Sequence, residues 1–267
     1  MTLISFLGPK GTFTHQAANI IGDNLIPYCT IPAVMESVES DETFFGVVPI
    51  ENSLEGGVGI TLDSLANKFD LNIYKEIIMP INQNLIVNKG CSMNDIVDIY
   101  SHQQAIGQCR EFILENNIQP HYVVSTAHAV KKIIGDKTKA AIGNKKACEL
   151  YGLEILKSNI QDNNNNETRF IVVSKKEHKI TGKDKTSIIF SIYEDYPGGL
   201  YDVLGIFQKN CINLTKIESR PSKKGLGKYL FFIDFVGHKD DPLINDILYE
   251  IEGNTSFLKI LGSYPKL

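Results

Sequence analysis

The sequence lacks the residue patterns that mark several large classes of protein. Its five cysteines are odd in number and scattered, so they form neither a disulfide framework nor a Cys-x-x-Cys metal site. Its six histidines are also dispersed, and none is paired with another at the spacing of metal ligands. We therefore expect no bound metal and a chain that resides in a reducing cytoplasm.

Positive charge and long apolar runs are also missing. The chain has 27 basic and 31 acidic residues and a net charge of −4, which argues against a general nucleic-acid binder. No apolar run reaches the roughly 18 residues that a membrane helix needs. Residues 1–8 show no charged region, long apolar region or cleavage site of a signal peptide. We expect a globular protein that binds neither nucleic acid nor membrane.

The composition of the chain changes at residues 175–185. This stretch is charged, contains a glycine and shows no apolar period, so we interpret it as a linker. The 267 residues are enough for one large or two ordinary domains. The linker divides the chain into a first part, residues 1–174, and a second part, residues 186–267.

Short apolar runs alternate with helical patterns in the first part. The apolar runs predict strands at Leu3–Leu7, Phe45–Ile50, Ile73–Met79, Asn84–Val87, Val97–Tyr100, Tyr122–Val124, Ala140–Ile142 and Phe170–Val173. Helical spacing predicts apolar faces at Leu62/Leu65/Ala66/Phe69, Ala105/Cys109/Phe112 and Ala127/Val130/Ile134. This alternation predicts an α/β fold with largely parallel sheets.

The second part shows a different order of elements. Strands are expected at Thr186–Tyr193, Ile212–Glu218, Tyr229–Val236 and Ser256–Leu261. Helix faces are expected at Leu200/Val203/Leu204/Phe207 and Ile244/Ile247/Leu248/Ile251. The resulting order, βαββαβ over about 80 residues, is that of the ferredoxin-like fold.

A hydroxyl and a guanidinium stand side by side at Thr168 and Arg169, where a short apolar strand begins. The preceding asparagines, residues 163–166, predict a polar loop outside the core. A strand end can hold polar side chains rigidly while they face a cleft. Arg169 can bind a carboxylate with two parallel hydrogen bonds, and Thr168 can donate one proton to an oxygen beside it. The pair suggests a site for a small anionic substrate, although an ordinary surface arginine remains the alternative.

Four turns of the first part repeat one pattern, in which a strand ends, small polar residues follow and a helix is expected to begin. They contain Gly8, Lys10, Gly11 and Thr12; Glu51, Asn52 and Ser53; Ser101; and Ser125 and Thr126. Free N–H groups at a helix start favour carboxylates, and in open α/β sheets such turns line the ligand crevice. Each hydroxyl is also a plausible helix cap and nothing more, and Glu51 a plausible surface carboxylate.

Taken together, these segments resemble the prephenate dehydratase family. The matching motifs, in order, are Gly8–Thr14, Val48–Ser53, Ser125–Ala127 and Asn166–Phe170, followed by Pro197–Leu200 and Glu218–Pro221 of a regulatory ACT domain. The resemblance spans nearly the whole chain. One departure is visible, because Gln103 replaces the proline that the family usually has between the histidine and the glutamine of that turn.

The resemblance implies a two-lobed catalytic domain similar to periplasmic binding proteins, with the active site between the lobes. Residues 1–78 and 155–174 would form one lobe, and residues 79–154 the other. That crossing would bring Thr168 beside the early turns of Gly8 and Glu51. Residues 186–267 would form the ACT domain, and the chain would assemble as a homodimer or homotetramer.

The implied reaction is the conversion of prephenate to phenylpyruvate with loss of carbon dioxide and hydroxide, without a cofactor. Thr168 is the implied proton donor, Glu51 is the rival acid, and Asn52 and Ser53 complete the catalytic set. The substrate-binding set implied is Gly8, Lys10, Gly11, Thr12, Ser101, Ser125, Thr126, Arg169 and Phe170. Feedback by L-phenylalanine would use Gly198, Gly199, Leu200, Asn213, Leu214, Glu218, Ser219 and Arg220.

Three other functions stay open at this stage. An arogenate dehydratase would use nearly the same residues, since its substrate differs only in an amino group in place of the keto group. A solute-binding module without catalysis would share the two-lobed fold. An amino-acid sensor is the third, although the sequence shows no DNA-binding motif through which it would act.

Overall fold

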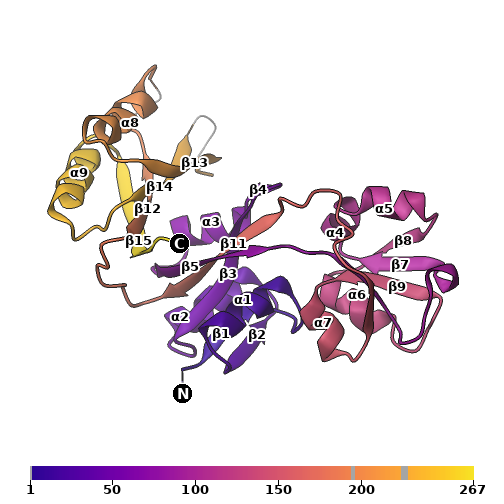
Figure 1. Cartoon of the computed structure of the whole chain (residues 1–267). Helices are drawn as coiled ribbons and strands as arrows, with labels where there is room; N and C mark the ends of the chain where they lie inside the picture. Colours follow the sequence, from indigo (N-terminus) through magenta and orange to yellow (C-terminus); the bar gives the residue numbers. More distant parts are fainter. Residues whose placement is uncertain (1, 194–195, 224–227) are drawn as a thin grey trace. The chain divides into compact units, whose positions relative to one another are not determined.

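The structure is a computed structural model, and it describes residues 2–193, 196–223 and 228–267 (Figure 1). The chain forms two compact units. One unit contains the chain up to Val34 together with Val47–Gly56 and Ile78–Phe170, and the other contains Met35–Gly46, Gly57–Ile77 and Ile171–Leu267. In the described part of the chain, the strands form three sheets.

The first sheet has the strand order β2-β1-β3-β11-β5, with the short β4 paired to β3. Its strands are β1 (Ile4–Leu7), β2 (Leu25–Tyr28), β3 (Phe45–Asn52), β4 (Gly56–Gly57), β5 (Asn72–Pro80) and β11 (Glu167–Ser174). The helices between them are α1 (Phe13–Ile21), α2 (Ile31–Glu39) and α3 (Gly59–Asn67). The central strands β3 and β11 carry fully buried aliphatic side chains, as expected of strands covered on both faces. This strand order places β3 beside β11, although more than a hundred residues separate them in the sequence.

The second sheet has the strand order β10-β6-β9-β7-β8. It contains β6 (Asn84–Val87), β7 (Asp98–Ser101), β8 (Gln119–Tyr122), β9 (Lys139–Gly143) and β10 (Glu154–Lys157). Its helices are α4 (Gln103–Gly107), α5 (Arg110–Glu115), α6 (Thr126–Lys132) and α7 (Lys145–Leu150), with a 3₁₀ turn, η1 (Met93–Asp95). Strand β7 runs parallel to β8 and β9, but β6 is antiparallel to β9 and β10, so the prediction of a largely parallel sheet is wrong for this half.

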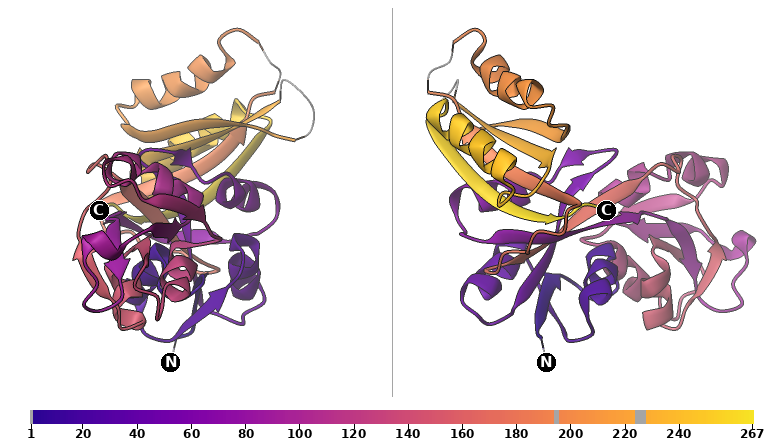
Figure 2. Two further views of the ribbon diagram at one scale, coloured as in Figure 1. Left: turned by 90° about the vertical axis from the view of Figure 1, so that its right-hand side faces the viewer. Right: turned by 60° about the vertical axis from the view of Figure 1, so that its left-hand side comes forward.

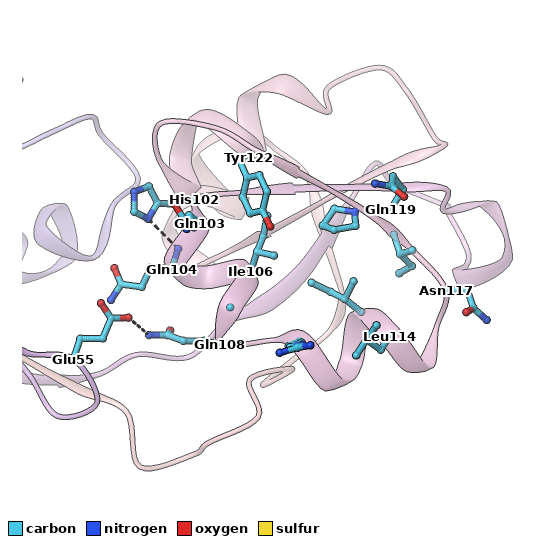
Figure 3. Close-up of a pocket in the computed structure, with 15 residues that line it drawn as sticks. Glu55, His102, Gln103, Gln104, Ile106, Gln108, Leu114, Asn117, Gln119 and Tyr122 are labelled. Carbon is cyan, nitrogen blue, oxygen red and sulfur yellow. Dashed lines mark hydrogen bonds between the residues drawn. The ribbon is translucent and has the colours of Figure 1, made fainter.

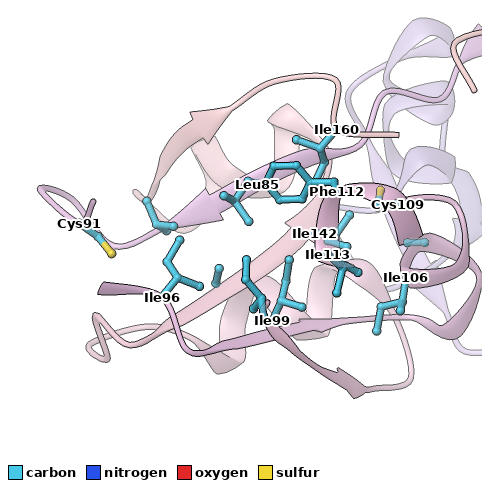
Figure 4. Close-up of a cluster of buried hydrophobic side chains, with 14 residues drawn as sticks. Leu85, Cys91, Ile96, Ile99, Ile106, Cys109, Phe112, Ile113, Ile142 and Ile160 are labelled. Carbon is cyan, nitrogen blue, oxygen red and sulfur yellow. The ribbon is translucent and has the colours of Figure 1, made fainter. Parts of the chain in front are cut away.

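Alternation along β6 explains why this sheet is buried on both faces. Leu85 and Val87 belong to one apolar cluster, which also holds Phe112 and Ile113 of α5 (Figure 4). Ile86 belongs to a second cluster, with Ala129 and Val130 of α6 and Cys148 of α7. Successive side chains of a strand point to opposite faces, so each face of the sheet receives its own pair of helices.

The structure corrects several predicted boundaries in the second sheet. The strand predicted at Tyr122–Val124 lies earlier, at Gln119–Tyr122, and Val124 is 81% exposed. This is an edge strand, where Pro120 is tolerated because one side of the strand pairs with nothing. The helix predicted through Ile134 ends at Lys132, and Ile133 is buried whereas Ile134 is 51% exposed. The pattern Ala105/Cys109/Phe112 spans two short helices, α4 and α5.

The third sheet has the strand order β13-β14-β12-β15 and is antiparallel throughout. It contains β12 (Asp184–Ser191), β13 (Leu214–Pro221), β14 (Tyr229–Val236) and β15 (Phe257–Pro265), with the helices α8 (Gly199–Lys209) and α9 (Pro242–Gly253). Both helices cover one face of the sheet, and their apolar sides meet Ile188, Phe190, Phe231 and Ile233 (Figure 2). The βαββαβ order predicted for this part is confirmed, although β13 begins two residues later and β15 ends four residues later than predicted.

Candidate functional site

The ends of β3 and β11 bring the strongest candidates of the sequence together. Ser53 continues the pairing beyond β3, because its backbone N–H donates to the Glu167 carbonyl with an N···O distance of 2.9 Å. The Ser53 hydroxyl accepts from the Glu167 N–H and donates to the Asn165 carbonyl. A helix start predicted at Ser53 is therefore wrong, since Ser53 begins the turn between β3 and β4 and α3 begins only at Gly59.

Asn52 is held in one orientation by its neighbours. Its Oδ1 accepts from the backbone N–H groups of Leu54 and Glu55 at 3.0 and 3.1 Å. A backbone N–H can only donate, so the atom that faces these two groups must be the amide oxygen. The Nδ2 of Asn52 consequently faces the opposite way, and it lies 2.9 Å from the Thr168 hydroxyl oxygen.

This orientation assigns the hydroxyl of Thr168 its hydrogen-bonding role. Because Asn52 Nδ2 donates to Thr168 Oγ1, the threonine oxygen is the acceptor in that bond. The proton of the hydroxyl then remains for another acceptor. Thr168 is partly exposed at the start of β11, so it can present that proton to a bound molecule.

Two side chains that sequence reasoning missed extend this arrangement. Asn166 accepts from Asn52 Nδ2 at 2.7 Å and donates its own Nδ2 to Gln108 Oε1 at 3.0 Å. Gln108 in turn donates to a carboxylate oxygen of Glu55 at 3.3 Å. Asn166 is 1% exposed, so the prediction that the asparagine loop lies outside the core is wrong at this position. Hydrogen bonds on both sides of its amide make that burial possible.

Arg169 lies within β11 and is mostly buried, with 8% of the residue exposed. Its Nη1 lies 3.5 Å from Glu51 Oε2, which is longer than a strong charge-assisted hydrogen bond. A buried guanidinium needs negative charge or hydrogen-bond acceptors nearby to offset the loss of water. Phe170, the next residue, is 2% exposed and packs in the core of the sheet.

The Gly8–Thr12 loop reaches α6 and α7 through Gly11. Gly11 has a φ of 92°, in the left-handed region that favours glycine, and a Cβ at this position would lie 3.3–3.4 Å from the side chains of Ala127 and Ala147. The Gly11 carbonyl accepts from Asn144 Nδ2 at 2.9 Å. Asn144 is the N-cap of α7 and was not predicted from the sequence, because a cap alone gives no sign of a distant partner.

His15 supports the same loop from α1. Its Nδ1 accepts from the Gly11 backbone N–H at 3.0 Å, and its ring stacks on Phe6 with centroids 5.0 Å apart. Burial lowers the pKa of His15, and the nearby ammonium groups of Lys146 and Lys10 lower it further. The neutral ring is thus the form that fits this site.

The hydroxyls of the other predicted turns already have partners within the protein. Thr12 caps α1 by accepting from the His15 N–H, and Ser125 caps α6 by accepting from the His128 N–H. Ser101 is fully buried and donates to the Ile142 carbonyl at 2.8 Å, which ties β7 to β9. Thr126 is the first residue of α6. Capping, the alternative left open by the sequence, accounts for Thr12 and Ser125.

Gln103, the departure from the family motif, is the first residue of α4. Proline is well tolerated at this helix position, because the N–H it lacks would have no intrahelical partner. Either residue is thus compatible with a helix start here, and the His102 ring caps the helix through Gln104 N–H.

A pocket of about 1070 Å³ lies beside α4, α5 and β8 (Figure 3). Ile106, Ile113 and Pro120 contribute apolar surface, and amide side chains and Arg110 line it as well. Glu55 and Gln108 also line it, so the pocket adjoins the hydrogen bonds that lead to Thr168. Its lining does not include Thr168 or Arg169.

In the second unit, the residues predicted to bind L-phenylalanine lie around the start of α8 and along β13. Gly198 is the N-cap of α8, with a φ of 102°. On β13 the side chains alternate, and those of Glu218 and Arg220 lie against Gly57 and Gly59, where a Cβ would approach them to within 2.7 Å. Arg220 also pairs with Asp63 of α3 at 3.2 Å. Ser219 lies on the opposite face and is exposed, as strand alternation requires.

Asp63 receives both Arg220 and Lys223, the latter at 2.6 Å. Burial acts to raise its pKa, but the hydrogen bonds from Lys223 and Arg220 outweigh that effect and the pKa is lowered. Asp63 therefore stays charged and holds β13 against the start of α3.

Among the described residues, no helix is long and apolar enough to cross a membrane. The same residues contain no group of three or more His, Cys, Asp or Glu side chains arranged to hold a metal ion.

The chain is similar to known proteins over nearly its whole length. The family model described as prephenate dehydratase matches residues 4–178, and the model of the ACT domain matches residues 186–253. A prephenate dehydratase of Methanocaldococcus jannaschii is 45% identical, with 96% of each chain covered. A bifunctional chorismate mutase/prephenate dehydratase of Aquifex aeolicus is 44% identical over 98% of this chain and 73% of its own. A crystal structure of prephenate dehydratase from Arthrobacter aurescens in complex with L-Phe has a TM-score of 0.90 and 35% identity, and the match covers 99% of this chain and 90% of that one.

Proposed function

The chain belongs to the prephenate dehydratase family, and we propose that Thr168 is the proton donor of its reaction, the conversion of prephenate to phenylpyruvate. The observation that supports this role is the hydrogen bond from Asn52 Nδ2 to Thr168 Oγ1, which leaves the threonine proton for the substrate. In enzyme classification the protein is a carbon–oxygen lyase.

The reaction removes two groups from one ring. As the bond between the ring carbon and its carboxylate breaks, carbon dioxide leaves and the electron pair enters the ring. The bond from the opposite ring carbon to its hydroxyl breaks at the same time, and the oxygen leaves with the electron pair of that carbon–oxygen bond. Thr168 donates its proton to the departing oxygen through a hydrogen bond, so the oxygen leaves as water, and the threonine oxygen regains a proton from solvent. The ring becomes aromatic, so the protein has mainly to position the substrate and stabilise the developing charge.

Prephenate carries two carboxylates, and the site has to hold both. Arg169 lies one residue from Thr168 and is the best candidate for one of them, with Glu51 as its partner when the site is empty. Lys10 and the loop of Gly8, Gly11 and Thr12 are proposed for the other, together with Ser125 and Thr126, and the buried Ser101 is proposed to hold its turn in place through its bond to the Ile142 carbonyl. Asn52 and Ser53 keep the two strand ends together, and we retain Glu51 as the alternative acid.

Regulation is proposed to use the third sheet. The similar prephenate dehydratase of Arthrobacter aurescens is a complex with L-Phe, and residues 186–253 of this chain match the model of the ACT domain. We infer that L-phenylalanine binds at the start of α8, near Gly198, Gly199 and Leu200, with Asn213, Leu214 and Ser219 beside it. Glu218 and Arg220 are then placed to connect that site with α3. ACT domains of this kind bind ligand between paired domains, so we propose that the active form is a homodimer or homotetramer. The proposed location is the cytoplasm.

The proposed domain boundaries are residues 1–174 for the catalytic domain, 175–185 for the linker and 186–267 for the ACT domain. The catalytic lobes are proposed at 1–78 plus 155–174 and at 79–154.

The first experiment mixes the purified chain with prephenate and follows phenylpyruvate formation, with and without L-phenylalanine. We expect turnover that L-phenylalanine suppresses. Turnover with no response to L-phenylalanine would contradict the regulatory proposal alone. Turnover of arogenate but not prephenate would change the substrate, and no turnover of either would contradict catalysis and favour a solute-binding role.

The pH dependence of stability provides a second prediction. The pKa of His15 is lowered in the folded state, so the unfolded chain binds more protons once the pH drops below the ordinary value of 6.5. The contribution of neutral His15 is present above pH 6.5 and is lost as the pH falls through the lowered pKa of the folded state.

Thermal melting measured between about pH 8 and pH 5 tests this prediction. His15→Asn keeps an acceptor near the position of Nδ1 but cannot titrate in that range. We expect the melting temperature of the variant to be lower at neutral pH, because the stacking on Phe6 is lost. Its further decrease with acid should be smaller than that of the wild type. Parallel decreases in both proteins would exclude His15 as the source.

A further inference from the structure

Asn166 connects two side chains that come from distant parts of the chain. Its Oδ1 accepts from Asn52 Nδ2 at 2.7 Å, and its Nδ2 donates to Gln108 Oε1 at 3.0 Å. Its backbone carbonyl accepts from the Ile81 N–H at 2.8 Å, so the residue is held by its main chain as well. Only 1% of Asn166 is exposed, so its amide has no access to bulk water as an alternative partner.

Backbone groups determine the direction of these hydrogen bonds. The N–H groups of Leu54 and Glu55 force the oxygen of Asn52 toward themselves and its nitrogen toward Asn166. The atom of Asn166 that meets this nitrogen must then be its oxygen, which leaves its nitrogen for Gln108. The direction follows from donors that cannot accept.

The opposite end of the series requires the same direction. Glu55 offers only acceptors when it is charged, so the atom of Gln108 facing it is the nitrogen, at 3.3 Å. The oxygen of Gln108 consequently faces Asn166, and Gln83 Nε2 points to the same oxygen at 3.4 Å. The backbone donors beside Asn52 and the carboxylate of Glu55 therefore require the same direction of hydrogen bonding. Asn166 is the buried residue that joins Asn52 to Gln108 in this series.

We propose that Asn166 is a positioning residue of the dehydratase reaction, a role that rests on the proposed function of Thr168. Its oxygen takes one N–H of Asn52, and the other N–H is shared between the Thr168 hydroxyl oxygen at 2.9 Å and the Glu167 carbonyl at 3.1 Å, which keeps the threonine hydroxyl in its donating role toward the substrate. Its nitrogen holds the Gln108 amide with Nε2 facing Glu55. Asn166 acts through these two side chains and has no contact of its own with the departing group.

The substitution Asn166→Asp tests the direction of the hydrogen bonds with almost no change in shape. An ionised Asp at this position still accepts from Asn52, but it has no proton for Gln108 Oε1 and faces that oxygen with a negative charge. A protonated Asp again donates to Gln108 and accepts from Asn52, as asparagine does. Burial raises the pKa of such a carboxyl, so the change of state falls within a measurable range of pH.

We expect kcat of Asn166→Asp at about pH 8 to be tenfold to a hundredfold below wild type, the range typical of lost partners behind a functional group. The ratio of its kcat to that of the wild type should rise as the pH falls to about 5, where the carboxyl gains its proton. A residue with a purely structural role would change stability, but its kcat would follow the wild-type pH profile.

Asn165→Asp is the matched control, because it makes the same chemical change one residue away at an exposed position. Its kcat and pH profile should match the wild type.

Should Asn166→Asp fail to fold, Glu55 offers a second test, because it is the exposed residue at the other end of the hydrogen-bond series. Glu55→Gln keeps an acceptor for Gln108, whereas Glu55→Lys places a donor there and opposes the direction. We expect kcat to fall severalfold in Glu55→Lys and to stay near wild type in Glu55→Gln.

The outcomes separate this inference from the proposed function. Wild-type turnover together with an Asn166→Asp variant that follows the wild-type kcat and pH profile would overturn the role of Asn166 and leave the enzyme intact. For an unfolded Asn166→Asp, equal kcat in the two Glu55 variants would overturn it in the same way. Absence of prephenate turnover in the wild type would contradict the proposed function first.

Discussion

Replacing Thr168 with alanine is expected to lower kcat by about 10²–10⁴ and to change KM little, because a positioned proton donor acts mainly in the transition state. Asn52 donates to the Thr168 oxygen, so the threonine proton is available to the departing hydroxide. Thr168→Ala removes that proton and leaves the neighbouring carboxylate-binding groups in place. Steady-state kinetics with prephenate measure kcat and KM separately.

Thr168→Ser is the matched control, since it keeps the hydroxyl and loses only the methyl group. Serine has more freedom at χ1 than threonine, so a modest loss of kcat is expected. If Thr168→Ala keeps nearly the wild-type kcat, Thr168 is not the donor and Glu51 becomes the candidate. In that case the pH–rate profile should show an acidic limb that disappears in Glu51→Gln.

Replacing Asn52 with aspartate is expected to reduce kcat about as much as removing the hydroxyl of Thr168. One oxygen of the new carboxylate still accepts from the Leu54 and Glu55 N–H groups, so the turn is preserved. The other oxygen replaces the nitrogen that donates to Thr168, and it can only accept. The Thr168 hydroxyl then donates to the carboxylate and is withdrawn from the substrate. The added charge also repels an anionic substrate, so KM should rise in this variant but not in Thr168→Ala.

A double-variant cycle distinguishes this explanation from two separate effects. If Asn52 acts through Thr168, the kcat of the double variant should be close to that of the single variant with the lower kcat. Multiplied losses would show that Asn52 contributes to catalysis independently of Thr168. The comparison uses kcat and not kcat/KM, because the added charge changes substrate binding by itself.

Much of the fold could be predicted from local patterns. Apolar runs and helical spacing located most central strands and the order of the ACT part, because buried strands and amphipathic helices carry their periodicity in the residues themselves. The four-residue edge strands β2 and β10 were missed, since partly exposed edges need few apolar residues. The antiparallel direction of β6 was also missed, because no residue pattern in one strand records the direction of its neighbour.

The sequence by itself determined the candidate residues at 166–170 and 51–53, because strand ends and polar turns are local features. Only the tertiary structure decided which group donates and which accepts, since that depends on partners more than a hundred residues away. Asn166 illustrates the difference: in the sequence it is one of four loop-forming asparagines. In the folded chain β3 and β11 lie side by side, and Asn166 alone of the four is buried.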